Sequence, residues 1–214
     1  NCVVDADIKG FFDNIDHDWM VKFLEHDIAD KNFIRYIKRF LIGGVMEDGK
    51  KLNTEVGTVQ GGLISPVLAN VYLHYVLDTW FAYISKREFS GEMYMDRYAD
   101  DFVCLFQYEQ EAQKFYQMLV ERMKKFGLEL VEDKSRIMPF GRYKSTKESF
   151  DFLGFTHYNG KSHWSKYCVL HRTSKKKLKQ KRQSAKQWLR EHMHESIPDT
   201  VQKLNKKLVG HYQY

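Results

Sequence analysis

Two adjacent acidic residues, Asp100 and Asp101, separate two apolar segments that have the pattern of strands. Neighbouring carboxylates at a strand turn repel each other, and a bound cation would remove that cost. Asp7 comes near the end of another apolar segment, residues 2–8. If these segments are neighbours in a sheet, the three carboxylates meet at one sheet end and suit a pair of Mg²⁺ ions in phosphoryl transfer. The alternative is that all three are ordinary turn residues, because aspartate favours turns.

A second cluster combines Gln60, Gly61 and Gly62 with the dipeptide Ser65-Pro66. Serine as N-cap and proline in the first turn predict that a long helix begins here. Two glycines before such a helix allow the backbone to approach a flat or charged ligand closely. Taken alone, this pattern is also common in loops without a ligand.

The segments that must position these residues alternate between helical and extended patterns. Helices are predicted at residues 16–28, 30–42, 65–80 and 109–126, from 173 onward, and again after 196–198. Strands are predicted at 2–8, 93–98, 102–106, 128–131, 137–140, 152–158 and 162–170, with turns at Asp48-Gly49 and Asn159-Gly160. The fold class is therefore predicted as α+β, with a mostly antiparallel sheet packed on helices.

The charge of the chain is unevenly distributed. The 214 residues carry a formal net charge of +6, whereas residues 172–207 alone hold 12 basic and three acidic side chains. This asymmetry favours a polyanion that is held by the basic end while chemistry takes place in the larger, mildly acidic part. The alternative is a solvated basic helix. The change in composition predicts a domain boundary between residues 1–171 and 172–214.

Composition also excludes several classes of protein. No apolar run approaches eighteen residues, so the sequence predicts no membrane-spanning helix and no membrane partner. The first residues lack the pattern of a signal peptide. Cys2, Cys104 and Cys168 are odd in number and far apart, which argues against a disulfide scaffold and a cysteine zinc site. A reducing cytoplasm is the expected compartment.

Five motifs between residues 5 and 155 occur in a specific order. They are DIKGFFDNIDH at 7–17, QGGLISPVLAN at 60–70, RYADD at 97–101, LVEDKS at 130–135 and FLGF at 152–155. In this order they resemble the reverse transcriptases encoded by group II introns, also called intron maturases. The resemblance implies a right-hand polymerase palm at residues 1–171, followed by the start of a helical, basic thumb at 172–214. The family's fingers segment would precede residue 1, so we expect the chain to be a fragment.

The resemblance also assigns roles to individual residues. The catalytic residues and metal ligands would be Asp7, Asp100 and Asp101, with the backbone carbonyl of Ile8 as a further ligand of two Mg²⁺ ions, for which Mn²⁺ could substitute. The nucleotide-binding residues would be Gly10, Phe11, Phe12, Gln60, Gly61 and Lys134, with the Phe12 ring under the sugar. The primer grip would be Phe152, Leu153, Gly154 and Phe155. The basic helix adds six residues expected to contact nucleic acid, namely Lys175, Lys176, Lys179, Arg182, Lys186 and Arg190. Asp5, Asp13 and Asp16 are expected to be structural, as helix-start and turn residues.

The implied function is RNA-directed DNA polymerisation in the bacterial cytoplasm. Deoxynucleoside triphosphates (dNTPs) would extend a DNA primer on an RNA template, the intron RNA, and the full-length protein would also bind that RNA and assist splicing. One alternative is a retron, diversity-generating or CRISPR-associated reverse transcriptase. Another is an RNA-binding splicing cofactor whose polymerase site is unused. An RNA-dependent RNA polymerase is disfavoured because Phe12 would crowd a 2′-hydroxyl, and a homodimer is left open.

Overall fold

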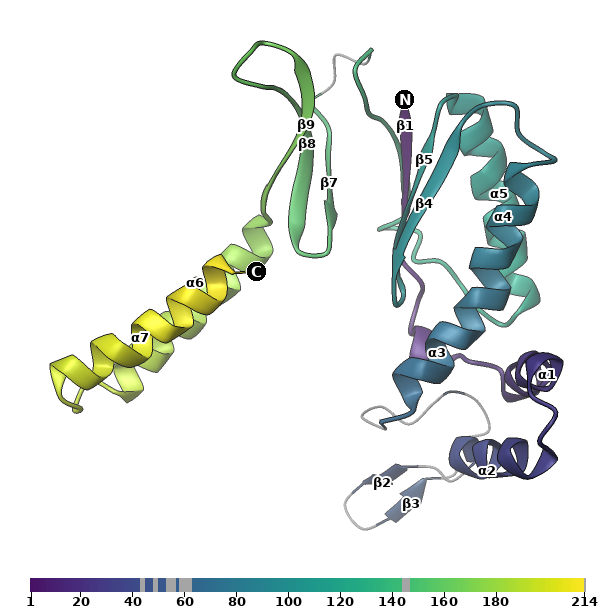
Figure 1. The fold of residues 1–214 in the computed structure, drawn as a ribbon, viewed down its shortest axis with the longest axis horizontal. Helices are drawn as coiled ribbons and strands as arrows, with labels where there is room; N and C mark the ends of the chain where they lie inside the picture. The colour runs from purple at the N-terminus through teal and green to yellow at the C-terminus, as the bar shows by residue number, and fades with distance from the viewer. Residues whose placement is uncertain (43–44, 48–49, 53–56, 58–62, 144–146, 214) are drawn as a thin grey trace. The chain divides into compact units, whose positions relative to one another are not determined.

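The computed structural model describes residues 1–42, 45–47, 50–52, 57, 63–143 and 147–213. Its elements in chain order are β1 (Cys2–Ala6), the 3₁₀ turn η1 (Phe11–Asp13), α1 (His17–Asp27), α2 (Lys31–Ile42), β2 (Val45–Glu47), β3 (Lys50–Leu52), α3 (Ser65–Leu73), the π turn η2 (His74–Asp78), α4 (Thr79–Ser85), β4 (Met93–Tyr98), β5 (Asp101–Phe106), α5 (Glu109–Lys125), β6 (Arg136–Pro139), β7 (Ser149–Phe152), β8 (Phe155–Lys161), β9 (Tyr167–Thr173), α6 (Lys175–Glu191) and α7 (Ile197–Tyr212). Helices alternate with antiparallel strands (Figure 1), and the predicted α+β class is confirmed.

A four-stranded antiparallel sheet in the order β4-β5-β1-β6 is the centre of this fold. Helices α4 and α5 lie along one of its faces (Figure 1). The alternate residues Cys2, Val4 and Ala6 of β1 belong to the same buried cluster as Phe115 and Leu119 of α5. A Val, Leu or Phe side chain contributes about 1.5–3 kcal/mol when it is fully buried. This cluster therefore fixes one face of β1 against the helices.

The opposite face of the sheet has a smaller apolar cluster. Its buried members are Val3 of β1, Val103 of β5, Met138 of β6, Phe140 just after β6, and Phe150 of β7. The rings of Phe140 and Phe150 meet edge to face with centroids 5.1 Å apart. Because successive side chains of a strand alternate between faces, Val3 is followed on this face by Asp5 and then Asp7. The face thus changes from apolar to acidic along β1.

Of the residues predicted to start helices, Asp16 is confirmed and Ser65 is not. Asp16 is the N-cap of α1, and its carboxylate accepts a hydrogen bond from Trp19 N at 2.9 Å, which confirms its helix-start role. The predicted N-cap Ser65 is wrong by one residue, since Ile64 is the N-cap of α3 and Ser65 is buried in the first turn. Pro66 in that turn has no N–H to be satisfied, so a capping side chain is less needed.

The predicted turn at Asn159-Gly160 is wrong, because both residues lie inside β8. A Cβ atom on Gly160 would come within 2.5 Å of Leu170 Cδ1. Glycine is therefore needed here for close packing against the neighbouring strand and not for a turn. The hairpin predicted around residues 48 and 49 is present as the antiparallel pair β2–β3, although those two turn residues lie outside the described residues.

The described chain divides into two compact units, each considered by itself. The first comprises Asn1–Leu153 and His157–Leu170, and the second comprises Gly154–Thr156 and His171–Tyr214. In the second unit, Lys207 of α7 lies over the Trp188 ring of α6 at 5.1 Å from its centroid. The predicted division into a palm at residues 1–171 and a thumb at 172–214 stays a prediction. Among the residues that the structure describes, no helix has the length and apolar character needed to cross a membrane.

Candidate active site

Asp7 and Asp101 occupy facing positions on the sheet face opposite α4 and α5. The pairs between β1 and β5 end with Ala6 opposite Phe102, and the next pair in this register joins Asp7 to Asp101. Asp5 and Asp7 are two residues apart, so their side chains project from the same face as Asp101. The predicted adjacency of the first strand and the later hairpin is confirmed, while the catalytic role of these carboxylates stays a prediction.

Asp100 lies in the two-residue turn between Tyr98 and Asp101, which are the last pair of β4 and β5. Ala99, the first turn residue, has a φ of 55°. A positive φ at only the first central residue is the sign pattern of a type II′ turn, where glycine is usual. An alanine in this left-handed region costs about 1–2 kcal/mol. Backbone strain of this kind is concentrated at functional sites.

Asp5 is part of the same acidic face, although the sequence predicted it to be a turn or helix-start residue. That prediction is wrong, because Asp5 lies inside β1 with Arg136 Nε 3.5 Å from its carboxylate. Burial raises the pKa of Asp5, the Arg136 guanidinium opposes this shift, and the charges of Asp101 and Asp151 add to it. The signal that could have identified Asp5 is the two-residue spacing from Asp7, which places both on one face of a strand.

Lys134 brings a positive charge to Asp7, with Nζ 2.6 Å from Oδ2. The hydrogen bond to Asp7 and the charge of that carboxylate raise the pKa of Lys134, and the charge of Asp101 contributes further. Backbone contacts bring this segment to β1, since Val131 N donates to Asp7 O at 2.8 Å and Lys134 N to Val131 O at 3.1 Å. The strand predicted at 128–131 is reduced to a single bridge between Ile8 and Leu130.

The acidic face fits a divalent cation. The Lys134 ammonium lies 2.6 Å from Asp7, so this carboxylate already holds a positive charge at the acidic face. The Ile8–Leu130 bridge uses the Asp7 carbonyl and the Lys9 N–H, so the Ile8 carbonyl is directed away from it. Carboxylate and carbonyl oxygens are the ligands that Mg²⁺ prefers. In the described part of the chain, no three His, Cys, Asp or Glu side chains converge closely enough to hold a metal by themselves. Water or substrate would therefore complete the coordination.

The segment after β1 is a tight 3₁₀ turn whose two phenylalanines differ in burial. Gly10 has a φ of 50°, and the Asn14 side chain donates to Gly10 O at 2.9 Å. Phe11 is buried in the main core, so only its backbone is available to a ligand. Phe12 is partly buried at the edge of the same core, with its ring centroid 5.5 Å from that of Phe11. Of the other predicted nucleotide-binding residues, Gln60 and Gly61 lie outside the described residues.

The predicted primer grip is the connection between β7 and β8. Phe152 ends β7 and packs against the smaller apolar cluster, and Phe155 begins β8. The two residues between them, Leu153 and Gly154, have φ values of 51° and 83°. Positive φ at both central residues is the sign pattern of a type I′ turn, which joins strands tightly. The role of this turn in gripping a primer stays a prediction.

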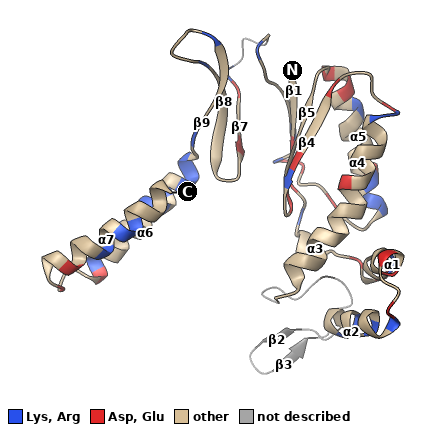
Figure 2. Ribbon diagram, viewed as in Figure 1, with Lys and Arg blue, Asp and Glu red and all other residues tan. Residues whose placement is uncertain are grey.

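Helix α6 presents a dense row of cations. Ser174 caps it by accepting a hydrogen bond from Lys177 N at 3.3 Å, and none of its residues is buried. Figure 2 shows basic residues along this helix. Four of the residues predicted to contact nucleic acid line one shallow groove with Leu178 and Leu189, namely Lys175, Lys179, Arg182 and Lys186. Their spacing of three or four residues places them on one side of the helix.

Two curated proteins are each similar to this chain over 71 residues. Group II intron-encoded protein LtrA of Lactococcus lactis subsp. cremoris is 45% identical over 71 residues, which are 33% of this chain and 12% of that protein. An uncharacterized 91 kDa protein in the cob intron of Schizosaccharomyces pombe is 41% identical over 71 residues, 33% of this chain and 9% of that protein. The chain therefore matches only a small part of the length of these relatives.

Solved structures with a similar fold include telomerase from Candida albicans in complex with the TWJ fragment of telomeric RNA. The TM-score is 0.58 at 14% identity, over 73% of this chain and 29% of the telomerase chain. Telomerase from Candida tropicalis gives the same TM-score at 13% identity, over 73% of this chain and 31% of that chain. The fold is that of a polymerase palm. Residues 1–157 match the family model described as reverse transcriptase (RNA-dependent DNA polymerase), and the chain belongs to this family.

Proposed function

We propose that this chain is the polymerase core of a group II intron-encoded reverse transcriptase. It extends a DNA primer on an RNA template with dNTPs, and the template is the intron RNA. The observation that carries the proposal is the register that sets Asp7 opposite Asp101 on one sheet face, next to a turn that contains Asp100. The match of residues 1–157 to the reverse transcriptase family and the likeness to LtrA support it.

Members of this family use divalent metal ions. We assign Asp7, Asp100, Asp101 and the Ile8 carbonyl as the ligands of two Mg²⁺ ions, which Mn²⁺ could replace. When bound, such a pair stabilises the attacking and the leaving oxygens of nucleotidyl transfer. The ion pair of Asp7 with the Lys134 ammonium supports this assignment.

The other residues of the chain bind and orient the reactants. A cation on Asp7 would displace Lys134, whose ammonium is then free to pair with the triphosphate of the incoming nucleotide. We assign the left-handed Gly10 and the backbone of Phe11 to the triphosphate, and the partly buried Phe12 ring to the sugar. The cations of α6 neutralise phosphates of the template–primer duplex without reading its sequence.

The test is primer extension by the full natural protein on an RNA template with a DNA primer, dNTPs and Mg²⁺. Asp7→Asn and Asp101→Asn each remove one negative charge from the acidic face, so both variants should lose extension. RNA binding should persist, because the basic helix is unchanged. Asp18→Asn makes the same chemical change at an exposed position in the first turn of α1 and is the matched control.

Near wild-type extension by either site variant would refute the two-metal assignment. A natural protein that binds intron RNA and promotes splicing but extends no primer would instead support a splicing cofactor with an unused polymerase site. An intron ribozyme flanking the gene would separate the intron-encoded class from retron, diversity-generating and CRISPR-associated enzymes.

A further inference from the structure

The helix that begins at Ser65 is interrupted by the π turn η2 before it continues as α4. In this turn the Thr79 N–H donates to the carbonyl of His74, five residues earlier. A π turn takes up one more residue than an α turn, and one residue corresponds to about 100° of rotation around a helix axis. The turn therefore changes the direction in which its last residue, Asp78, projects. Such turns are frequent at functional sites.

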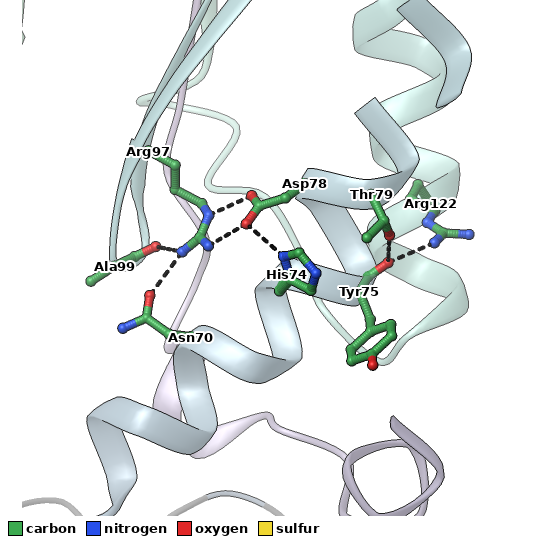
Figure 3. Close-up of polar contacts among 8 residues, drawn as sticks. All are labelled: Asn70, His74, Tyr75, Asp78, Thr79, Arg97, Ala99 and Arg122. Carbon is green, nitrogen blue, oxygen red and sulfur yellow. Dashed lines mark hydrogen bonds and ion pairs between the residues drawn. The ribbon is translucent and has the colours of Figure 1, made fainter. Parts of the chain in front are cut away.

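Two side chains support the π turn. Arg122 of α5 donates from Nη2 to Tyr75 O at 3.1 Å and from Nε to Val76 O at 2.9 Å. The Thr79 hydroxyl also donates to Tyr75 O at 3.0 Å (Figure 3). Burial lowers the pKa of Arg122, in keeping with a guanidinium withdrawn from water onto these carbonyls. The π turn is thus stabilised by Arg122 from α5 and by Thr79 from the start of α4.

Asp78 and Arg97 form a pair with two hydrogen bonds between the π turn and strand β4. Arg97 Nε lies 2.7 Å from Asp78 Oδ1, and Nη2 lies 2.5 Å from Oδ2. The Arg97 side chain is only 12% exposed, and His74 Nδ1 lies 3.5 Å from the same carboxylate. A two-bond pair of arginine and carboxylate fixes the orientation of both groups as well as their charge.

The remaining terminal nitrogen of Arg97 contacts the turn that carries the acidic pair. Nη1 donates to Ala99 O at 2.8 Å and to Asn70 Oδ1 at 3.0 Å (Figure 3). Ala99 has the left-handed φ of 55° and directly precedes Asp100 and Asp101. The guanidinium therefore connects α3 and η2 to the backbone of the residue that directly precedes the two carboxylates.

We propose that Arg97 and Asp78 are positioning residues for Asp100 and Asp101, and that the π turn serves to direct Asp78 toward Arg97. Tyr98 pairs with Asp101 and shares its face of the sheet. Arg97 is the residue before Tyr98, so the Arg97 side chain lies on the opposite face, which the helices cover. Arg97 contacts the turn through the Ala99 carbonyl, from the face of the sheet opposite the acidic residues. The inference rests on the proposed polymerase function for its activity measurement, but not for its structural one.

Two variants of the full natural protein test the proposal. Asp78→Asn keeps the shape of the side chain but removes its charge, and Arg97→Lys keeps the charge but loses the forked geometry. In each, the turnover number of primer extension should fall about 10- to 100-fold, as for other residues that orient metal ligands. The KM for the nucleotide and the Kd for template–primer should stay within about twofold of wild type, because neither residue contacts these ligands in the proposal. Asp78→Glu should recover part of the lost turnover.

Hydrogen exchange on the metal-free protein gives a readout that does not depend on activity. Amides of residues 98–102 should exchange about tenfold faster in Asp78→Asn, while those of β1 keep their protection. Glu88→Gln removes the exposed partner of Lys114 and should change neither measurement. Unchanged exchange at 98–102, or acceleration that extends to β1, would overturn the positioning role. If the wild-type protein extends no primer, the proposed function fails, and the exchange result still decides this inference.

Discussion

The Lys134 ammonium lies 2.6 Å from the Asp7 carboxylate, although 127 positions separate the two residues in the chain. The Lys134 side chain is 66% exposed, whereas that of Asp7 is 32% exposed. Lys134 is therefore held mainly by this carboxylate and can leave it without disturbing the core. The contact brings an exposed cation to the position where the proposed chemistry needs one.

Lys134→Ala should lower kcat/KM for nucleotide incorporation about 10- to 150-fold. A charge-assisted hydrogen bond to the triphosphate is worth about 1.5–3 kcal/mol, and about 1.4 kcal/mol corresponds to a factor of ten. Steady-state primer extension at varied dNTP concentration measures the effect, and Lys134→Arg should recover part of it. Lys9→Ala removes the neighbouring exposed pair with Glu129 and serves as the control. Unchanged kcat/KM in Lys134→Ala would exclude a role in triphosphate binding.

Phe12→Ala should relax the selection of the sugar. A phenyl ring below C2′ leaves no room for a hydroxyl group, and a steric difference of this size is worth about 10- to 200-fold in discrimination. The measured quantity is incorporation of ribonucleotides relative to deoxyribonucleotides. Phe12→Leu keeps most of the bulk and should change the ratio much less. A ratio that stays constant in Phe12→Ala would make Phe12 a packing residue at the edge of the core.

Charge reversal on α6 should weaken RNA binding and reduce its dependence on salt. Each phosphate contact contributes about 0.7–0.9 to the slope of log K against log salt concentration. Reversal to glutamate is made at three exposed lysines of the groove face, namely Lys175, Lys179 and Lys186. The control reverses three exposed lysines of the first unit, namely Lys22, Lys86 and Lys124. A slope equal to that of wild type would identify α6 as a solvated surface.

Glu111→Gln should reduce stability in a pH-dependent way. Burial raises the pKa of Glu111, but hydrogen bonds from Ser90 and Gly91 and the charge of Lys114 outweigh it, so the pKa lies below the usual 4.5. Its stabilising effect is therefore complete above pH 4.5 and is lost as the pH falls through the lowered value. Urea unfolding should show the largest difference from wild type at pH 7 and a smaller one at pH 3.5.

Glu121→Gln is the control for this titration, because Glu121 is exposed on the same helix. A difference between wild type and Glu111→Gln that is equal at both pH values would mean that the carboxylate charge contributes nothing.

The sequence was sufficient to predict most of the secondary structure and the family. The hydrophobic repeats predicted most helices and strands, and the ordered motifs around Asp7 and Asp101 predicted the family, because periodicity and short motifs are properties of neighbouring residues. The same reasoning failed at Gly160 and at residues 128–131. In the first case a Leu170 side chain on another strand requires the glycine, and in the second only a single bridge to Ile8 forms.

Long-range contacts were decided by the tertiary structure alone. The sequence contains Arg97 and Asp78 but does not indicate that a π turn brings them together, because their contact depends on how this turn packs against strand β4. Likewise, only the register of β1 and β5 shows that Asp5 shares a face with Asp101. The sequence by itself determined the family, the α+β class and the acidic residues. The tertiary structure decided which groups orient those residues, since pairing register and helix rotation depend on contacts between distant segments.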